Sequence, residues 1–203
     1  MDTRAWFACL ALCALGVAGC SNNTNPAGPS PTGSAIVLWR NGVAGTWFGN
    51  SLVLGGGCGA STVTMTDNIT GDTNVLLYSA TNQGYSSVLS LSSSAAANPS
   101  SYYAAGHLQF DIELATANTN NLDLEFEDSA QTSWPFVDTV PPSSLSSSTF
   151  THESIPLASF SCGGCPTGLS TAINLPFMLT WSQGNAGACA ANVYLNDIQW
   201  TSN

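Results

Sequence analysis

Two segments of the chain alternate apolar and polar residues without interruption. Residues 107–114 read HLQFDIEL, and residues 122–127, LDLEFE, repeat the pattern. A period of two places successive side chains on opposite faces of an extended strand, whereas an amphipathic helix needs a period near 3.6 residues. Both segments are therefore predicted to be half-buried β-strands. Their outward side chains would be His107, Gln109, Asp111 and Glu113 in the first strand and Asp123, Glu125 and Glu127 in the second.

Short extended segments fill most of the remaining chain, and helical periodicity is almost absent. Turn formers such as Asn41-Gly42 separate these segments. Many short strands joined by turns are typical of an all-β sandwich of two antiparallel sheets. Helix is expected only near residues 143–147. The further strands are predicted at residues 35–39, 46–54, 61–66, 75–79, 86–91, 152–156, 176–182 and 192–201.

The N-terminal segment predicts export. Residues 6–19 carry no charge, which suits a signal-peptide core and falls short of the about 20 apolar residues of a transmembrane helix. The segment ends in Val17-Ala18-Gly19-Cys20 and resembles the bacterial lipoprotein signal, in which the cysteine is lipidated and becomes the mature N-terminus. Ser21 follows, which by resemblance to Gram-negative sorting implies the outer membrane. An ordinary secretory signal with an incidental cysteine is the alternative.

The sequence divides into three parts. Residues 1–19 are the predicted signal peptide. Residues 20–34 join the lipidated Cys20 to an uncharged stretch rich in Ser, Pro and Asn, which cannot bury enough apolar surface to fold and is predicted to be a flexible linker. Residues 35–203 are long enough to form one domain with a proper core.

The charge balance limits the partners. The chain has a net charge of −10, and Arg40 is its only Lys or Arg beyond the leader. This balance argues against nucleic acid and against electrostatic attachment to anionic lipid, so the membrane contact is expected through the lipid anchor alone. Only 7% of residues are charged, which leaves a neutral polar surface suited to ligands such as sugars.

Four cysteines remain after the leader and Cys20 are set aside: Cys58, Cys162, Cys165 and Cys189. An even number in an exported chain predicts two disulfides, for which three pairings exist. Cys162 and Cys165 flank two glycines and could close on each other, which would leave Cys58 for Cys189. A four-cysteine zinc site is the competing interpretation.

Four segments stand in series along the chain: residues 98–114 (NPSSYYAAGHLQFDIEL), 150–160 (FTHESIPLASF), 176–179 (PFML) and 193–200 (VYLNDIQW). In this order they resemble galactose-binding-like jelly rolls, and in particular the modules appended to exo-β-glucanases of marine bacteria. The resemblance covers about half of the folded region and implies a jelly-roll β-sandwich in a superfamily that mostly binds carbohydrate. Residues 40–60 have no clear match.

Sugar recognition combines aromatic rings with carboxylates and amides. Six residues of these types are candidates for ligand binding. Trp134 follows the second alternating strand in a predicted loop, and Trp47 stands beside Phe48 among glycines. Each tryptophan could instead fill the core or plug the end of the sandwich. If the two alternating strands are neighbours, their carboxylates would form an acidic strip, which is either a solvated face or part of a sugar-binding or cation site. The predicted ligand-binding residues are Trp134, Trp47, Asp123, Glu125, Asp111 and Gln109.

A structural calcium ion is the one cofactor that the sequence suggests. Asp197, in the closing strand, resembles an aspartate that holds calcium in related jelly rolls, but calcium needs several oxygen ligands and only this one can be named. No nucleophile or zinc-protease motif accompanies the two histidines, His107 and His152.

These features together predict a non-catalytic surface lipoprotein that binds a neutral glycan. One alternative is a structural or adhesion module that binds a protein partner. The other is a small glycoside hydrolase or lyase, which would require two facing carboxylates.

Overall fold

Extended segments dominate the part of the chain that the structure describes. The computed structural model describes residues 34–56, 61–66, 74–80, 88–115, 122–128, 136–161, 171–181 and 191–202 of the 203-residue chain. These residues belong to one compact unit, Pro31–Asn203. The predicted signal peptide and Cys20 lie outside the described residues, so export and lipidation stay predictions.

The first sheet is built around the C-terminal strand. Its members are β1 (Ala35–Arg40), β2 (Val43–Ala44), β5 (Ser61–Thr66), β6 (Val75–Ala80), β8 (His107–Leu114), β11 (Thr151–Pro156) and β13 (Ala191–Thr201). The strand order begins β11-β8-β13, and two strands share the other edge of β13, each along a different part of its length. There β6 pairs with residues 191–195 and β1 with residues 198–201, while β5 and β2 extend the sheet beyond these strands.

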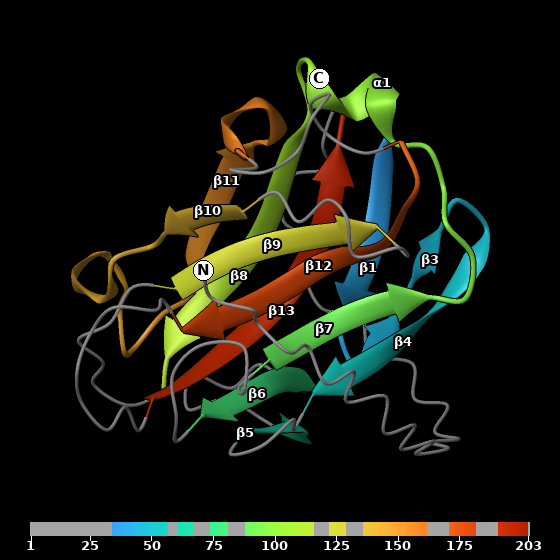
Figure 1. The fold of residues 1–203 in the computed structure, drawn as a ribbon. Helices are drawn as coiled ribbons and strands as arrows, with labels where there is room; N and C mark the ends of the chain where they lie inside the picture. Colours follow the sequence, from blue (N-terminus) through green and yellow to red (C-terminus); the bar gives the residue numbers. More distant parts are fainter. Residues whose placement is uncertain are drawn as a thin grey trace, which may run out of the picture. The chain divides into compact units, whose positions relative to one another are not determined.

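The second sheet holds the other alternating segment. It consists of β3 (Thr46–Trp47), β4 (Asn50–Gly56), β7 (Val88–Ser93), β9 (Leu122–Asp128), β10 (Phe136–Thr139) and β12 (Ile173–Trp181). The strand order is β10-β9-β12-β7-β4-β3. In Figure 1, β9, β12, β7 and β4 lie side by side as one layer in front of β8, β13 and β1. Since β8 and β9 belong to different sheets, the acidic strip that depended on their being neighbours does not form.

Most predicted strands are confirmed to within a few residues. The segment 46–54, predicted as one strand, is broken by a turn at Phe48-Gly49 into β3 and β4. Strands β2 and β10 were not predicted. The helical content of the described residues is one turn, α1 (Ser100–Tyr103), and two 3-10 helices, Pro142–Ser144 and Leu157–Ser159. No helix in these residues is long and apolar enough to cross a membrane.

The core lies between the sheets and is rich in aromatic rings toward one end. The Trp200 ring is fully buried and meets the rings of Trp47 and Phe126 at centroid distances of 5.0 and 5.1 Å. Its Nε1 donates a hydrogen bond to the Pro176 carbonyl at 3.0 Å, so the buried indole nitrogen is satisfied. This packing explains why Trp200 and its strand neighbours show apolar alternation in the sequence.

Candidate ligand-binding face

The outer face of the second sheet carries buried carboxyl groups. Leu122, Leu124 and Phe126 of β9 belong to the hydrophobic core. Because side chains alternate along a strand, Asp123, Glu125 and Glu127 project from the opposite side. We call this side of the second sheet the carboxyl face, and it comprises Asp123, Glu125, Glu127, Met178, Thr180, Ser90 and Gly55.

Glu125 lies in a row that crosses four strands. Met178 on β12 is its register partner, Ser90 on β7 is the partner of Met178, and Gly55 on β4 is the partner of Ser90. A Cβ atom at Gly55 would lie 2.6 Å from the Ser90 hydroxyl oxygen, so the glycine leaves room for that hydroxyl. On the other side of β9, Phe136 of β10 is the register partner of Glu125. The row therefore presents a carboxyl, a thioether and a hydroxyl beside bare backbone.

The carboxyl group of Glu125 is held in an unusual state. Glu125 is 1% exposed, and within the described part of the chain its Oε2 atom has no hydrogen-bond partner. Burial raises the pKa of Glu125 to about 8, and the charges of Glu127 and Asp123 contribute to the rise. Burial, followed by the charge of Asp128, raises the pKa of Glu127 to about 7. At neutral pH the Glu125 carboxyl is mostly neutral, and it can both donate and accept a hydrogen bond.

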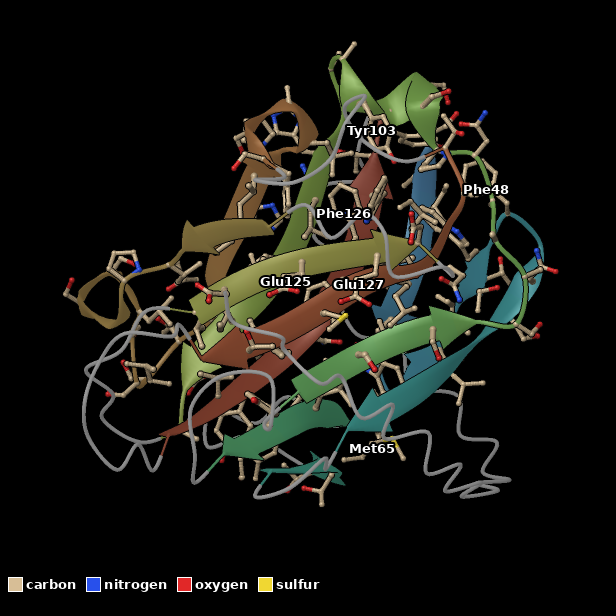
Figure 2. The ribbon with its side chains drawn as sticks, viewed as in Figure 1. Phe48, Met65, Tyr103, Glu125, Phe126 and Glu127 are labelled. Atoms are coloured by element: carbon tan, nitrogen blue, oxygen red, sulfur yellow. The ribbon has the colours of Figure 1, made fainter. Side chains whose placement is uncertain are left out.

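Figure 2 shows Glu125 and Glu127 on β9, beside β12. Two uncharged side chains next to them are buried on the same face: Met178 is 6% exposed and Thr180 is 1% exposed. Neither was singled out from the sequence. The available signal was their alternation with the core residues Phe177 and Leu179, which places them on the outer side of a strand that the sequence did predict.

The outer face of the first sheet is different, because its polar side chains bind one another. Arg40 Nη2 donates to Gln199 Oε1 at 3.2 Å, and Gln199 Nε2 donates to Gln109 Oε1 at 3.1 Å. Gln109 Nε2 in turn donates to the Ser154 hydroxyl at 3.2 Å. This chain of bonds, the amide network, links β1, β13, β8 and β11 and ties their side chains in place. Gln109 is thus engaged in holding the sheet and is less available to a ligand than the sequence suggested.

A second row of the same face contains Asp111. Its Oδ1 atom lies 2.7 Å from His152 Nδ1, and burial raises the pKa of Asp111 while the contact with His152 opposes that rise. Asp111 and Gln109 therefore share one face of β8, as predicted, but lie on the other sheet from Asp123 and Glu125. The structure divides the predicted acidic residues between two surfaces.

Asp197 is the bulged residue of β13, with a φ angle of 48°. Its Oδ1 atom accepts a hydrogen bond from Arg40 Nε at 2.5 Å, so the Asp197 carboxylate is already paired with a guanidinium. Across the described ranges, no group of three or more His, Cys, Asp or Glu side chains is placed to hold a metal ion. Calcium takes several oxygen ligands, amide and backbone carbonyl oxygens among them, and calcium at Asp197 stays a prediction.

Trp47 is a core residue, contrary to the prediction that its ring faces a ligand. It is fully buried, and its Nε1 donates to the Ile173 carbonyl at 2.8 Å. The turn after it brings the neighbouring Phe48 to the surface instead, at 44% exposure. Trp134 and the four cysteines Cys58, Cys162, Cys165 and Cys189 lie outside the residues whose side chains are described, so ligand stacking at Trp134, the disulfides and the alternative zinc site stay predictions.

Comparison with known proteins supports the fold. No family model matches the chain, and no curated protein matches it. Among solved structures it is similar to the family 30 carbohydrate-binding module of a Clostridium thermocellum cellulosomal cellulase, with a TM-score of 0.58 and 15% identity over 84% of this chain and 98% of that one. A family 11 module of the same organism, in complex with a β-1,3-1,4-mixed-linked tetrasaccharide, has a TM-score of 0.56 and 15% identity over 85% and 98% of the two chains.

A third similarity bears on the resemblance seen in the sequence. The extra C-terminal domain of an exo-1,3/1,4-β-glucanase from a Pseudoalteromonas species has a TM-score of 0.51 and 14% identity, covering 82% of this chain and 91% of that one. At these identities the comparison establishes architecture. The protein is an all-β jelly-roll sandwich of two antiparallel sheets, with the fold of carbohydrate-binding modules.

Proposed function

We propose that this chain is a non-catalytic carbohydrate-binding protein whose carboxyl face takes a neutral polysaccharide or oligosaccharide. The observation that carries the proposal is Glu125: a carboxyl 1% exposed, on the outer side of the sheet, with an oxygen that lacks a hydrogen-bond partner among the described residues. A buried polar group without a partner is costly. A ligand hydroxyl that displaced the atoms covering this carboxyl would satisfy it.

The protonation state favours a neutral glycan. A carboxyl with a pKa of about 8 is mainly protonated at neutral pH, so it offers a donor and an acceptor to sugar hydroxyls without a net charge. An anionic polysaccharide would approach a chain of net charge −10 and be repelled by it. Both arguments point to uncharged sugars, and the mixed-linked glucan tetrasaccharide bound by the similar family 11 module is a suitable first probe.

Trp134 remains the proposed stacking residue. It precedes Phe136 by two residues, which limits the distance between their Cα atoms to about 7 Å. Phe136 is the register partner of Glu125, so a ring at position 134 is within reach of the carboxyl face. The predicted lipid on Cys20 would hold this face at the outer membrane, where confinement raises the effective concentration for a repetitive polymer.

Binding is favoured over hydrolysis by the placement of the carboxyls. A glycosidase needs two carboxyl groups that flank the scissile bond. Glu125 and Glu127 project side by side from one face of one strand, so these two carboxyl groups would meet a bound glycan from the same side. The proposal is therefore recognition, and sampling the bound glycan for shorter products tests it directly.

The deciding experiment is retention of the whole chain on mixed-linkage β-glucan, β-1,3-glucan, cellulose, galactan and agarose. Glu125→Leu removes the hydrogen-bonding groups and should weaken retention about tenfold or more, the loss expected for about 1.4 kcal/mol. Trp134→Ala should do the same. Gln109→Ala, which alters the amide network on the other sheet, is the matched control and should bind like wild type. Absence of retention by folded wild-type protein on all five would reject the proposal.

A further inference from the structure

The turn between β3 and β4 exposes an aromatic ring on an unfavourable backbone conformation. Phe48 and Gly49 have φ angles of 47° and 86°, so both central residues of this two-residue hairpin are in the left-handed region. Such turns strongly prefer Asn-Gly, because a bulky side chain is strained at positive φ. The local backbone therefore argues against phenylalanine here, and the side chain itself is 44% exposed. Strain of this kind clusters at functional sites.

Phe48 borders an open cleft of about 540 Å³, lined by residues 35–37, 45–46 and 48–49 together with Tyr102. This volume lies within the range of small-ligand sites. Phe48 meets Trp47 and Tyr102 with interplanar angles of 87° and 88°. Neither neighbour stacks flat on the Phe48 ring, and the Phe48 side chain is 44% exposed where it borders the cleft.

Backbone polar groups border the same cleft. One edge of β1 pairs with β13 along Ala35, Ile36 and Val37. On the other edge, β2 pairs only with Trp39 and Arg40. No strand within the described ranges pairs with that edge at residues 35–37, and Gly45 packs against the carbonyl oxygen of Val37 alone. Open strand edges present N–H and C=O groups that need partners. The cleft thus places an aromatic face beside backbone donors and acceptors.

We infer that this cleft is a second carbohydrate site, which takes one ring of a neutral sugar chain through stacking on Phe48. An aromatic face together with donors and acceptors matches the two sides of a sugar ring, its C–H face and its hydroxyls. Figure 2 shows Phe48 well apart from Glu125 and Glu127, so the two sites can be occupied together. The class of ligand in this inference rests on the proposed function, whereas the place of binding rests on the cleft itself.

The test is calorimetric titration of the whole chain with two neutral probes, the mixed-linked β-glucan tetrasaccharide and an agarose-derived tetrasaccharide. Wild type should bind two molecules of one probe per chain. Phe48→Asn should bind one, and it should keep its cooperative unfolding transition, since asparagine tolerates the left-handed conformation. Phe48→Tyr preserves the ring and should bind two. Glu125→Leu should bind one, at the Phe48 cleft.

The outcomes separate the two proposals. Binding of a single molecule that Glu125→Leu abolishes and Phe48→Asn leaves unchanged would overturn the second site while leaving the carboxyl face intact. A single molecule lost only in Phe48→Asn would support the cleft and reject the carboxyl face. Absence of binding of both probes by folded wild type would overturn the inference. If Phe48→Asn still binds two molecules of the probe per chain, the Phe48 ring takes no part in binding and the inference is wrong.

Discussion

Replacing Glu125 by glutamine should change the pH dependence of stability. Burial and the neighbouring carboxylates raise the pKa of Glu125 from 4.5 to about 8 in the folded chain. Between these two values the native state holds a proton that the unfolded state releases, so the free energy of unfolding falls as the pH rises through that window. The stabilising contribution of the neutral carboxyl is complete below pH 4.5 and is lost once the pH exceeds about 8.

The size of the effect follows from the same values. Each tenfold change in proton affinity corresponds to about 1.4 kcal/mol, so a rise from 4.5 to about 8 sets an upper limit of about 5 kcal/mol. Glutamine cannot ionise and keeps nearly the same size. The stability of Glu125→Gln relative to wild type should therefore increase by about 1 kcal/mol per pH unit from about pH 5 to 8 and then level off.

Urea unfolding of both proteins at about pH 5, 7 and 9 measures this difference. Glu127→Gln is the comparison variant, because the charge of Glu127 is the second cause of the raised Glu125 pKa. Without the Glu127 charge the pKa of Glu125 should be lower. The loss of stability with rising pH should therefore end at a lower pH in Glu127→Gln than in wild type. A Glu125→Gln stability difference that stays constant over this range would show that Glu125 is not desolvated in the folded chain, and the reasoning behind the carboxyl face would be wrong.

Three further experiments test the fold around the sites. Trp47→Ala should lower the free energy of unfolding by about 3–5 kcal/mol, because a fully buried indole is removed; a loss below about 1 kcal/mol in urea unfolding would place this ring outside the core. Gly45→Ala puts a Cβ atom on the Val37 carbonyl oxygen and should cost about 3 kcal/mol by forcing the backbone apart, which a thermal melt would reveal; an unchanged melting temperature would contradict that close approach. The Arg40–Asp197 ion pair is 42% and 31% exposed, so a double-mutant cycle should give a coupling of about 0.5 kcal/mol that shrinks in high salt; a salt-independent coupling above about 2 kcal/mol would mean that the pair is effectively buried.

Local pattern alone was sufficient for the two alternating strands. The alternation in residues 107–114 and 122–127 predicted β8 and β9 together with the face that each turns to the core, since period two is a property of the extended backbone and needs no knowledge of neighbours. The four-residue strand β10 was missed because a segment that short carries too few alternating positions to register.

Which strands lie in the same sheet was decided only by the tertiary structure. The sequence presented Asp111 and Glu125 as members of similar strands, but the topology assigned β8 and β9 to different sheets, and so to two surfaces of different chemistry. On one surface the amides of Gln109 and Gln199 satisfy each other; on the other, burial leaves the Glu125 carboxyl neutral. Neither hydrogen-bond partner nor degree of burial is encoded in the local pattern.

The fate of two adjacent aromatic residues shows the same division. The sequence determined that Trp47 and Phe48 stand together before a glycine, but not which of them is buried. With the chain turning at Phe48-Gly49, the Trp47 indole lies in the core and the Phe48 ring borders the cleft beside Tyr102. Alternation along the chain determines that a strand has two faces. Only the packing of one sheet on the other decides which of two adjacent aromatic rings is enclosed and which remains for a ligand.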